Sequence, residues 1–126
     1  MRRWIAFVGA VLFTGAAAAQ DWRAPDSAKS LKNPVVKAAG IKDGKPSFDA
    51  NCALCHGRGG RGDGPAAASL NPKPKNLADK GIQGQSDGEL FWKISEGRGV
   101  MPSWKHLPEN QRWSLVQYIR SLAGKR

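Results

Sequence analysis

The segment Cys52-Ala53-Leu54-Cys55-His56 constrains this chain more than any other feature, because it holds both of the chain's cysteines. Two thiols three positions apart lie on one helical turn, where both can bond to the same flat cofactor. The histidine that follows is placed to bind a metal at the centre of that cofactor. C-x-x-C-H spacing is typical of covalent c-type haem attachment. We therefore expect thioether bonds from Cys52 and Cys55 and iron ligation by His56.

Two other kinds of site use closely spaced cysteines, and both fit the sequence less well. A redox-active C-x-x-C of the thioredoxin type accompanies a βαβ pattern, whereas no alternating apolar and polar run predicts a strand here. A structural zinc site takes four ligands, and the chain has only one histidine besides His56. One covalently bound haem c is therefore the expected cofactor.

The iron of such a haem takes a second axial ligand or keeps an open position. Met101 lies in the loop 97–102, which is rich in glycine and ends in proline. A methionine that only fills a core belongs on a helix face, and the glycines of this loop allow the backbone to approach a cofactor closely. Met101 is therefore the expected axial ligand, with His106, a lysine or an open site as the alternatives.

The N-terminal residues predict export. Two arginines precede the apolar run 5–13, and small residues up to Ala19 follow it, which is the pattern of a secretory signal peptide. We expect residues 1–19 to be cleaved after Ala19 and the mature chain to be periplasmic. An uncleaved membrane anchor is the alternative, but the uncharged stretch is shorter than the ~20 residues that span a bilayer. No stable membrane span is expected.

The length and charge narrow the choice of partners. The 126 residues suffice for one small domain, and the formal net charge is +10. Loss of two arginines with the signal peptide would leave a charge of +8. Because complementary charge steers association, we expect redox partner proteins with acidic docking surfaces. Lys73 and Lys75 fall in loops near the expected haem. Export makes nucleic acid an implausible partner.

Apolar spacing predicts an all-α domain of three to four short helices and long loops around the haem. One helix is expected over 43–56, with Pro46 in its first turn. A second, over 86–97, opens with a capping box in which Glu89 stands three residues after the N-cap serine. A third covers 108–122, where apolar residues recur at helical spacing.

The segment 20–42 shows no sustained period and contains two prolines. We expect it to be an extended arm that lies on the domain 43–126. Its apolar residues Trp22, Leu31 and Val35 are the expected anchors.

Three motifs in order resemble those of small monohaem class I cytochromes c of the bacterial periplasmic type. They are the haem motif 52–56, the turn 62–65 (Gly-Asp-Gly-Pro) and the segment 101–104 (Met-Pro-Ser-Trp) before a C-terminal helix with aromatic residues. The resemblance covers residues 43–123. It implies an all-α cytochrome c fold, in which the N- and C-terminal helices cross and loops enclose the haem.

Three smaller expectations concern the surroundings of the haem. The resemblance implies that the Pro65 carbonyl accepts a hydrogen bond from the imidazole N–H of His56, which would fix the tautomer and raise ligand basicity. Arg98 and Trp104 flank the Met101 loop and are candidates for hydrogen bonds to the haem propionates. Trp92 is expected in the core or against the haem.

The resemblance implies an electron carrier rather than an enzyme. With His56 and Met101 on the iron, no position remains for a substrate, so the chemistry is one-electron Fe(III)/Fe(II) exchange through the exposed haem edge. A dedicated cytochrome c subunit of a periplasmic dehydrogenase or oxidase complex is the alternative. A third hypothesis, an enzyme or gas sensor with an open haem, requires Met101 not to bind.

Overall fold

The computed structural model describes residues 21–125, in which helices are joined by turns and long loops. In chain order the elements are α1 (Asp26–Lys29), α2 (Lys37–Asn51), α3 (Ala53–His56), the 3-10 turn η1 (Ala67–Ser69), α4 (Lys80–Gln83), α5 (Asp87–Glu96) and α6 (Glu109–Ser121). Within 21–125 no strand forms, and no helix is long and apolar enough to cross a membrane. The expected signal peptide, residues 1–19, lies outside the described residues. The all-α prediction is confirmed, with single-turn helices added to the longer ones that we expected.

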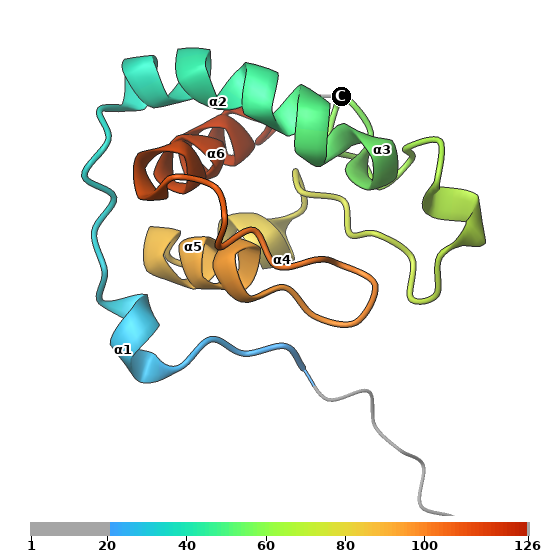
Figure 1. Cartoon of the computed structure of the whole chain (residues 1–126), viewed down its shortest axis with the longest axis horizontal. Coiled ribbons are helices and arrows are strands. Elements are labelled where there is room, and N and C mark those ends of the chain that lie inside the picture. Colours follow the sequence, from blue (N-terminus) through green and yellow to red (C-terminus); the bar gives the residue numbers. More distant parts are fainter. Residues whose placement is uncertain (1–20, 126) are drawn as a thin grey trace, which may run out of the picture.

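The crossing of α2 and α6 is the largest helix contact of the described chain (Figure 1). Gly44 allows the close approach, since a Cβ there would lie 2.2 Å from the carbonyl oxygen of Ser114. One turn further along α2, Phe48 packs against Tyr118 with ring centroids 5.0 Å apart, and both side chains are buried. This is the crossing of N- and C-terminal helices that the resemblance implied.

The beginning of α5 follows the capping-box prediction. The Ser86 hydroxyl accepts a hydrogen bond from the Glu89 backbone N–H at 3.1 Å, and the Glu89 carboxylate accepts one from the Ser86 N–H at 2.6 Å. The helix directs Leu90 and Ile94 into the core. Trp92 lies two positions after Leu90 and so on another side of the helix. It is half-buried but belongs neither to the core nor to the cavity described below, contrary to our expectation.

The first long helix differs from the prediction at both ends. It starts at Lys37 rather than at residue 43, so Pro46 stands inside α2 and not in its first turn. Proline there removes one backbone hydrogen bond, and packing on α6 supports the helix. The helix then stops at Asn51, and the haem motif forms the separate turn α3.

The arm 21–36 is not extended throughout, because it contains the helical turn α1. Its most deeply buried side chains are those of Ala24 and Ala28, which are 4% and 3% exposed. Val35 packs against the core as expected, and Trp22 is half-buried. Leu31 is 46% exposed and so buries less surface than expected, although its Cβ lies close to Gly88 of α5. Small side chains hold the arm because it runs close to α5.

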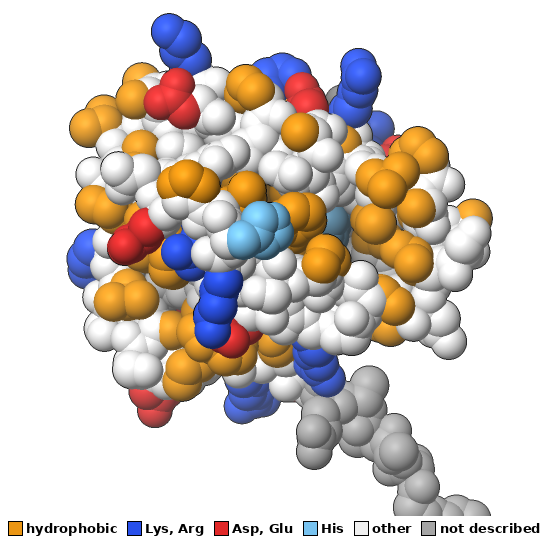
Figure 2. Space-filling view, in the orientation of Figure 1, with side chains coloured by type: hydrophobic (Ala, Val, Ile, Leu, Met, Phe, Trp, Pro, Cys, Tyr) orange, Lys and Arg blue, Asp and Glu red, His pale blue; other side chains and the backbone are white. Residues whose placement is uncertain are grey.

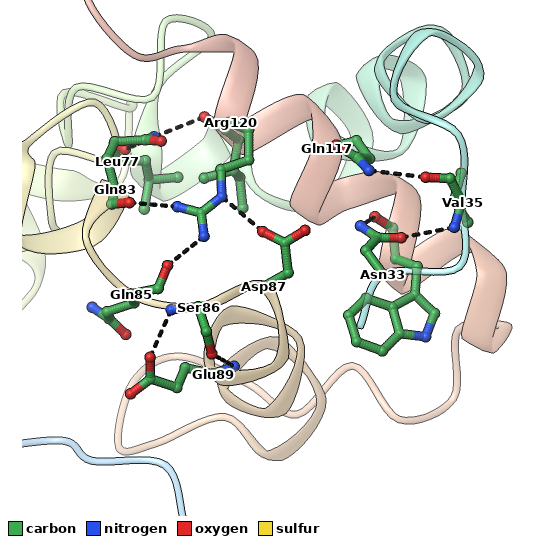
Figure 3. A network of polar contacts seen from close by, with 12 residues as sticks. Asn33, Val35, Leu77, Gln83, Gln85, Ser86, Asp87, Glu89, Gln117 and Arg120 are labelled. Carbon is green, nitrogen blue, oxygen red and sulfur yellow. Dashed lines mark hydrogen bonds and ion pairs between the residues drawn. The ribbon is translucent and has the colours of Figure 1, made fainter. Parts of the chain in front are cut away.

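A cluster of polar contacts ties α6 to the segment that connects α4 and α5 (Figure 3). The Arg120 guanidinium pairs with Asp87 Oδ1 at 2.8 Å and donates to the backbone carbonyl of Gln83 at 2.7 Å and to that of Gln85. The Gln83 side chain in turn donates to the Leu77 carbonyl at 2.8 Å. These bonds fix residues 77–87, several of which line the cavity described below.

We expect Gly44→Ala to destabilise the haem-loaded protein by about 1–3 kcal/mol, because an added methyl forces the two crossing helices apart. Chemical denaturation followed by circular dichroism measures this change. Gly59→Ala is the control, since Gly59 does not line the haem cavity and a Cβ there would meet only the Arg61 side chain, at an ordinary contact distance of 3.9 Å. That control should be neutral or slightly stabilising. Equal losses in both variants would contradict the packing argument.

Candidate haem-binding site

A cavity of about 1210 Å³ brings together the four residues expected to hold the haem, Cys52, Cys55, His56 and Met101. Its volume exceeds the roughly 300–1,000 Å³ of most small-molecule pockets. Much of the remaining wall is apolar, formed by Phe48, Leu70, Pro72, Pro74, Leu77, Ile82, Leu90, Ile94, Val100, Trp104 and Ile119. In Figure 2 hydrophobic side chains gather around histidine near the middle of the face on view, and Lys and Arg side chains project at its edges.

The imidazole of His56 has one nitrogen engaged by the backbone. Its Nδ1 lies 3.0 Å from the carbonyl oxygen of Lys75. Because a carbonyl only accepts, Nδ1 carries the proton and Nε2 keeps the lone pair that binds a metal. Burial lowers the pKa of His56, and the hydrogen bond to Lys75 opposes this shift. The neutral ring is therefore favoured, as iron ligation requires.

The partner of His56 differs from the one expected. The resemblance implied the carbonyl of Pro65, whereas the structure gives this hydrogen bond to Lys75. The reason lies in the proline-rich connector 71–76, after which the backbone returns to the haem-motif loop. The Leu77 N–H donates to the Gly60 carbonyl at 2.6 Å, and this contact carries the Lys75 carbonyl to the imidazole.

The two cysteines are unpaired thiols that line the cavity. Burial, with a smaller contribution from neighbouring Cys55, raises the pKa of Cys52 to about 12. A thiol of the redox-active C-x-x-C type needs a lowered pKa, because the thiolate is the nucleophile. The environment of Cys52 therefore argues against thiol–disulfide exchange and agrees with a thiol buried beside an apolar cofactor.

Met101 reaches the cavity from a tight turn rather than from a helix. The backbones of Arg98 and Met101 exchange two hydrogen bonds, of 2.9 and 3.0 Å. Gly97, at φ 66°, lets the chain reverse directly after α5. The turn is then fastened to α5, since the Trp104 N–H donates to the Ile94 carbonyl at 3.1 Å. The sequence prediction of a loop methionine is confirmed in this respect.

The structure places some of the other candidate residues near the Met101 loop inside the cavity lining and others outside it. Arg98 and Trp104 line the cavity, so both are within the region where we expected propionate contacts. His106, the alternative axial ligand, is exposed and is not among the lining residues. Its ring lies 5.5 Å from that of Trp104. The placement of these side chains favours Met101 over His106 as ligand.

The residues present fit a covalently bound haem. Two thiols and a neutral imidazole come from the end of α2 and from α3, and a thioether comes from the opposite loop. The apolar wall suits a porphyrin face, and the cationic side chains of the lining suit its carboxylates. Within residues 21–125 no cluster of three or more His, Cys, Asp or Glu side chains offers an alternative metal site.

Residues 39–119 match the family described as cytochrome c oxidase, cbb3-type, subunit III. The chain belongs to this family of cytochromes c. As a cytochrome c it carries a covalently bound haem c and serves in electron transfer.

Individual relatives are of two kinds. The chain is 33% identical over 97 residues to the cbb3-type cytochrome c oxidase subunit CcoP of Azospirillum brasilense, covering 75% of this chain and 32% of that subunit. It is 30% identical over 82 residues to cytochrome c6 of Chlorolobion braunii, covering 64% of this chain and 89% of that protein. The chain thus spans about a third of the oxidase subunit but most of cytochrome c6.

A solved structure has the same fold. A chain of the reducing HAO-like protein complex of Kuenenia stuttgartiensis superposes with a TM-score of 0.63 at 30% identity. The match covers 74% of this chain and 49% of that one.

Several contacts at the cavity escaped the sequence analysis. The Lys75 carbonyl is a backbone group, and no side-chain pattern reveals it. Trp22 and Lys93 line the cavity from the arm and from α5. Lys93 directly precedes Ile94, whose side chain belongs to the apolar face of α5. This position next to the apolar face was the only sequence signal that could have indicated Lys93.

Proposed function

We propose that the protein is an exported, periplasmic one-electron carrier whose haem iron is bound by His56 and Met101. One observation carries the proposal: thiols, imidazole and thioether from separate segments line a single apolar cavity. When bound, the haem supplies one-electron Fe(III)/Fe(II) exchange. If His56 and Met101 hold the iron, no position would be left for a substrate, and the chemistry that the bound haem would supply is electron exchange alone.

Each part of the chain has its own task in this proposal. Cys52 and Cys55 would hold the haem covalently. His56 would ligate the iron through Nε2, while the Lys75 carbonyl accepts a hydrogen bond from Nδ1. Met101 would ligate from the opposite loop, and methionine ligation raises the reduction potential of a haem. The apolar wall would limit the access of water to the haem.

The relatives favour two settings for the same chemistry. Coverage of 89% of a cytochrome c6 supports a carrier built of one domain. The match to cbb3-type oxidase subunits supports a dedicated subunit held in a larger complex. We propose the diffusing carrier as the first function and the subunit as the second.

Fractionation of the cells that make the protein distinguishes these settings. A carrier is released with the periplasm by osmotic shock and elutes from a sizing column at the mass of one chain. A subunit stays with a detergent-extracted membrane complex and co-elutes with other haem proteins. Recovery only from the membrane complex would overturn the first proposal and establish the second.

The charge of the cavity rim supports an acidic docking surface on the partner. Six of the lining residues are basic, namely Arg23, Lys29, Lys73, Lys75, Lys93 and Arg98, against three acidic ones, Asp21, Asp79 and Glu89. Opposite charge raises the association rate, and salt screens it over about 8–10 Å.

We therefore expect the second-order rate of reduction by hexacyanoferrate(II), an anion, to fall severalfold between low and physiological ionic strength. Stopped-flow absorbance measures this rate, and a cationic hexaammineruthenium(II) reagent should give the opposite trend.

The double variant Lys73→Gln/Lys75→Gln should slow reduction by hexacyanoferrate(II) more than Lys37→Gln/Lys42→Gln, whose exposed lysines lie on α2 away from the cavity. Equal slowing by both would contradict a docking surface at the cavity rim.

A further inference from the structure

The N-terminal arm reaches the cavity although it precedes the region 39–119 that the family matches. Trp22 and its two sequence neighbours are among the lining residues. Further along the arm, at Ala28, the backbone lies against α5. The buried Ala28 presents its carbonyl oxygen to Gly88, where a Cβ would lie only 1.9 Å from it. The structure therefore holds Trp22 in a defined place on the cavity wall.

Lys93 of α5 meets the arm at this wall. Its Nζ lies 5.4 Å from the centroid of the Trp22 ring, within the ~6 Å of a cation–π contact. It also donates a hydrogen bond of 2.6 Å to Gln85 Oε1. Lys93 is half-buried and lines the cavity, and burial lowers its pKa. Two neutral groups thus orient the ammonium without neutralising it.

None of the ion pairs in the described part of the chain includes Lys93. The carboxylates of Glu89 and Asp21 attract its charge from a longer distance, and Asp21 pairs with Arg23 at 3.3 Å. Glu89, one turn away on α5, is used in the capping box. By contrast, Lys29 at the same cavity pairs with Asp26 at 2.9 Å, and Lys73 donates to two backbone carbonyls. A half-buried ammonium is costly unless an anion lies beside it.

We propose that Lys93, positioned by Trp22 and Gln85, forms an ion pair with a carboxylate of the bound haem. The inference rests on the proposed haem site and adds to it a contact organised by the N-terminal arm. The ammonium partly neutralises the carboxylate, whose negative charge otherwise favours the ferric state. Lys93 therefore favours the ferrous state and raises the reduction potential.

Potentiometric titration of the haem-loaded variants tests this inference. At a fixed ambient potential we expect Lys93→Gln to raise the ratio of ferric to ferrous protein about three- to tenfold, since a partly desolvated pair is screened less than an exposed one. Lys93→Arg keeps the charge and should stay within about twofold of the parent protein. Lys32→Gln removes the same charge from an exposed position of the arm outside the cavity and should change the ratio by less than about 1.5-fold.

A crystal structure of the haem-loaded parent protein gives a readout that does not depend on any variant folding. Lys93 Nζ should lie within about 4 Å of a haem carboxylate oxygen. A longer distance would overturn the inference. So would a change in the ferric-to-ferrous ratio for Lys93→Gln that is no larger than the change for Lys32→Gln. Absence of covalent haem from the parent protein would instead overturn the proposed function, so the two failures are distinguishable.

Discussion

The double variant Cys52→Ser/Cys55→Ser should retain no haem after acid–acetone extraction, whereas the parent protein should retain one haem per chain. Serine hydroxyls do not form the thioether bonds that two cysteines of a C-x-x-C-H motif can make. Either single variant keeps one thiol and should retain a weakened attachment. Intact-mass spectrometry and the pyridine haemochrome spectrum measure the bound haem.

Leu54→Ser is the control for this experiment. Leu54 lies between the two cysteines but is 62% exposed, so the substitution changes the motif without touching a thiol. Attachment should be unchanged. A parent protein purified with zinc, or with a disulfide between Cys52 and Cys55, would contradict the assignment of these thiols.

Met101→Ala should abolish the weak far-red charge-transfer band of ferric iron bound to methionine sulfur. The same change should open one coordination position, so that cyanide binds the ferric protein and carbon monoxide the ferrous protein far more readily than in the parent. Met101→His should restore a closed site at a lower reduction potential, since methionine ligation raises the potential. Absorption spectra and potentiometry measure these changes.

His106→Ala is the matched control, because His106 is exposed and lies outside the cavity lining. It should leave the band, the ligand affinity and the potential unchanged. A far-red band that persists in Met101→Ala would assign the ligand role to another side chain.

The helical class and the set of candidate haem residues were both predictable from the amino-acid sequence. The reason is that both depend on short-range spacing. Apolar residues at helical intervals predicted α5 and α6, and the capping box of Ser86 and Glu89 placed the start of α5 correctly. The C-x-x-C-H spacing and the glycine-rich setting of Met101 depend on neighbouring residues in the same way.

Predictions made from neighbouring residues differed from the structure where tertiary packing outweighed the local preference. Pro46 suggested a helix that begins near residue 43, yet α2 starts at Lys37 because its contact with α6 supports a helix through the proline. Leu31 was expected to anchor the arm because it is apolar. Ala28 is instead the most deeply buried residue of the arm, because its carbonyl approaches α5 at Gly88 too closely for a side chain at that position.

The tertiary structure alone decided which distant groups complete the site. The carbonyl on His56 belongs to Lys75 rather than Pro65, because the chain after the proline-rich connector returns to Gly60. Lys93 meets Trp22 because the arm crosses α5 at Gly88. A sequence pattern records spacing along the chain, whereas a backbone carbonyl or a cation–π pair depends on which segments the packed core brings into contact.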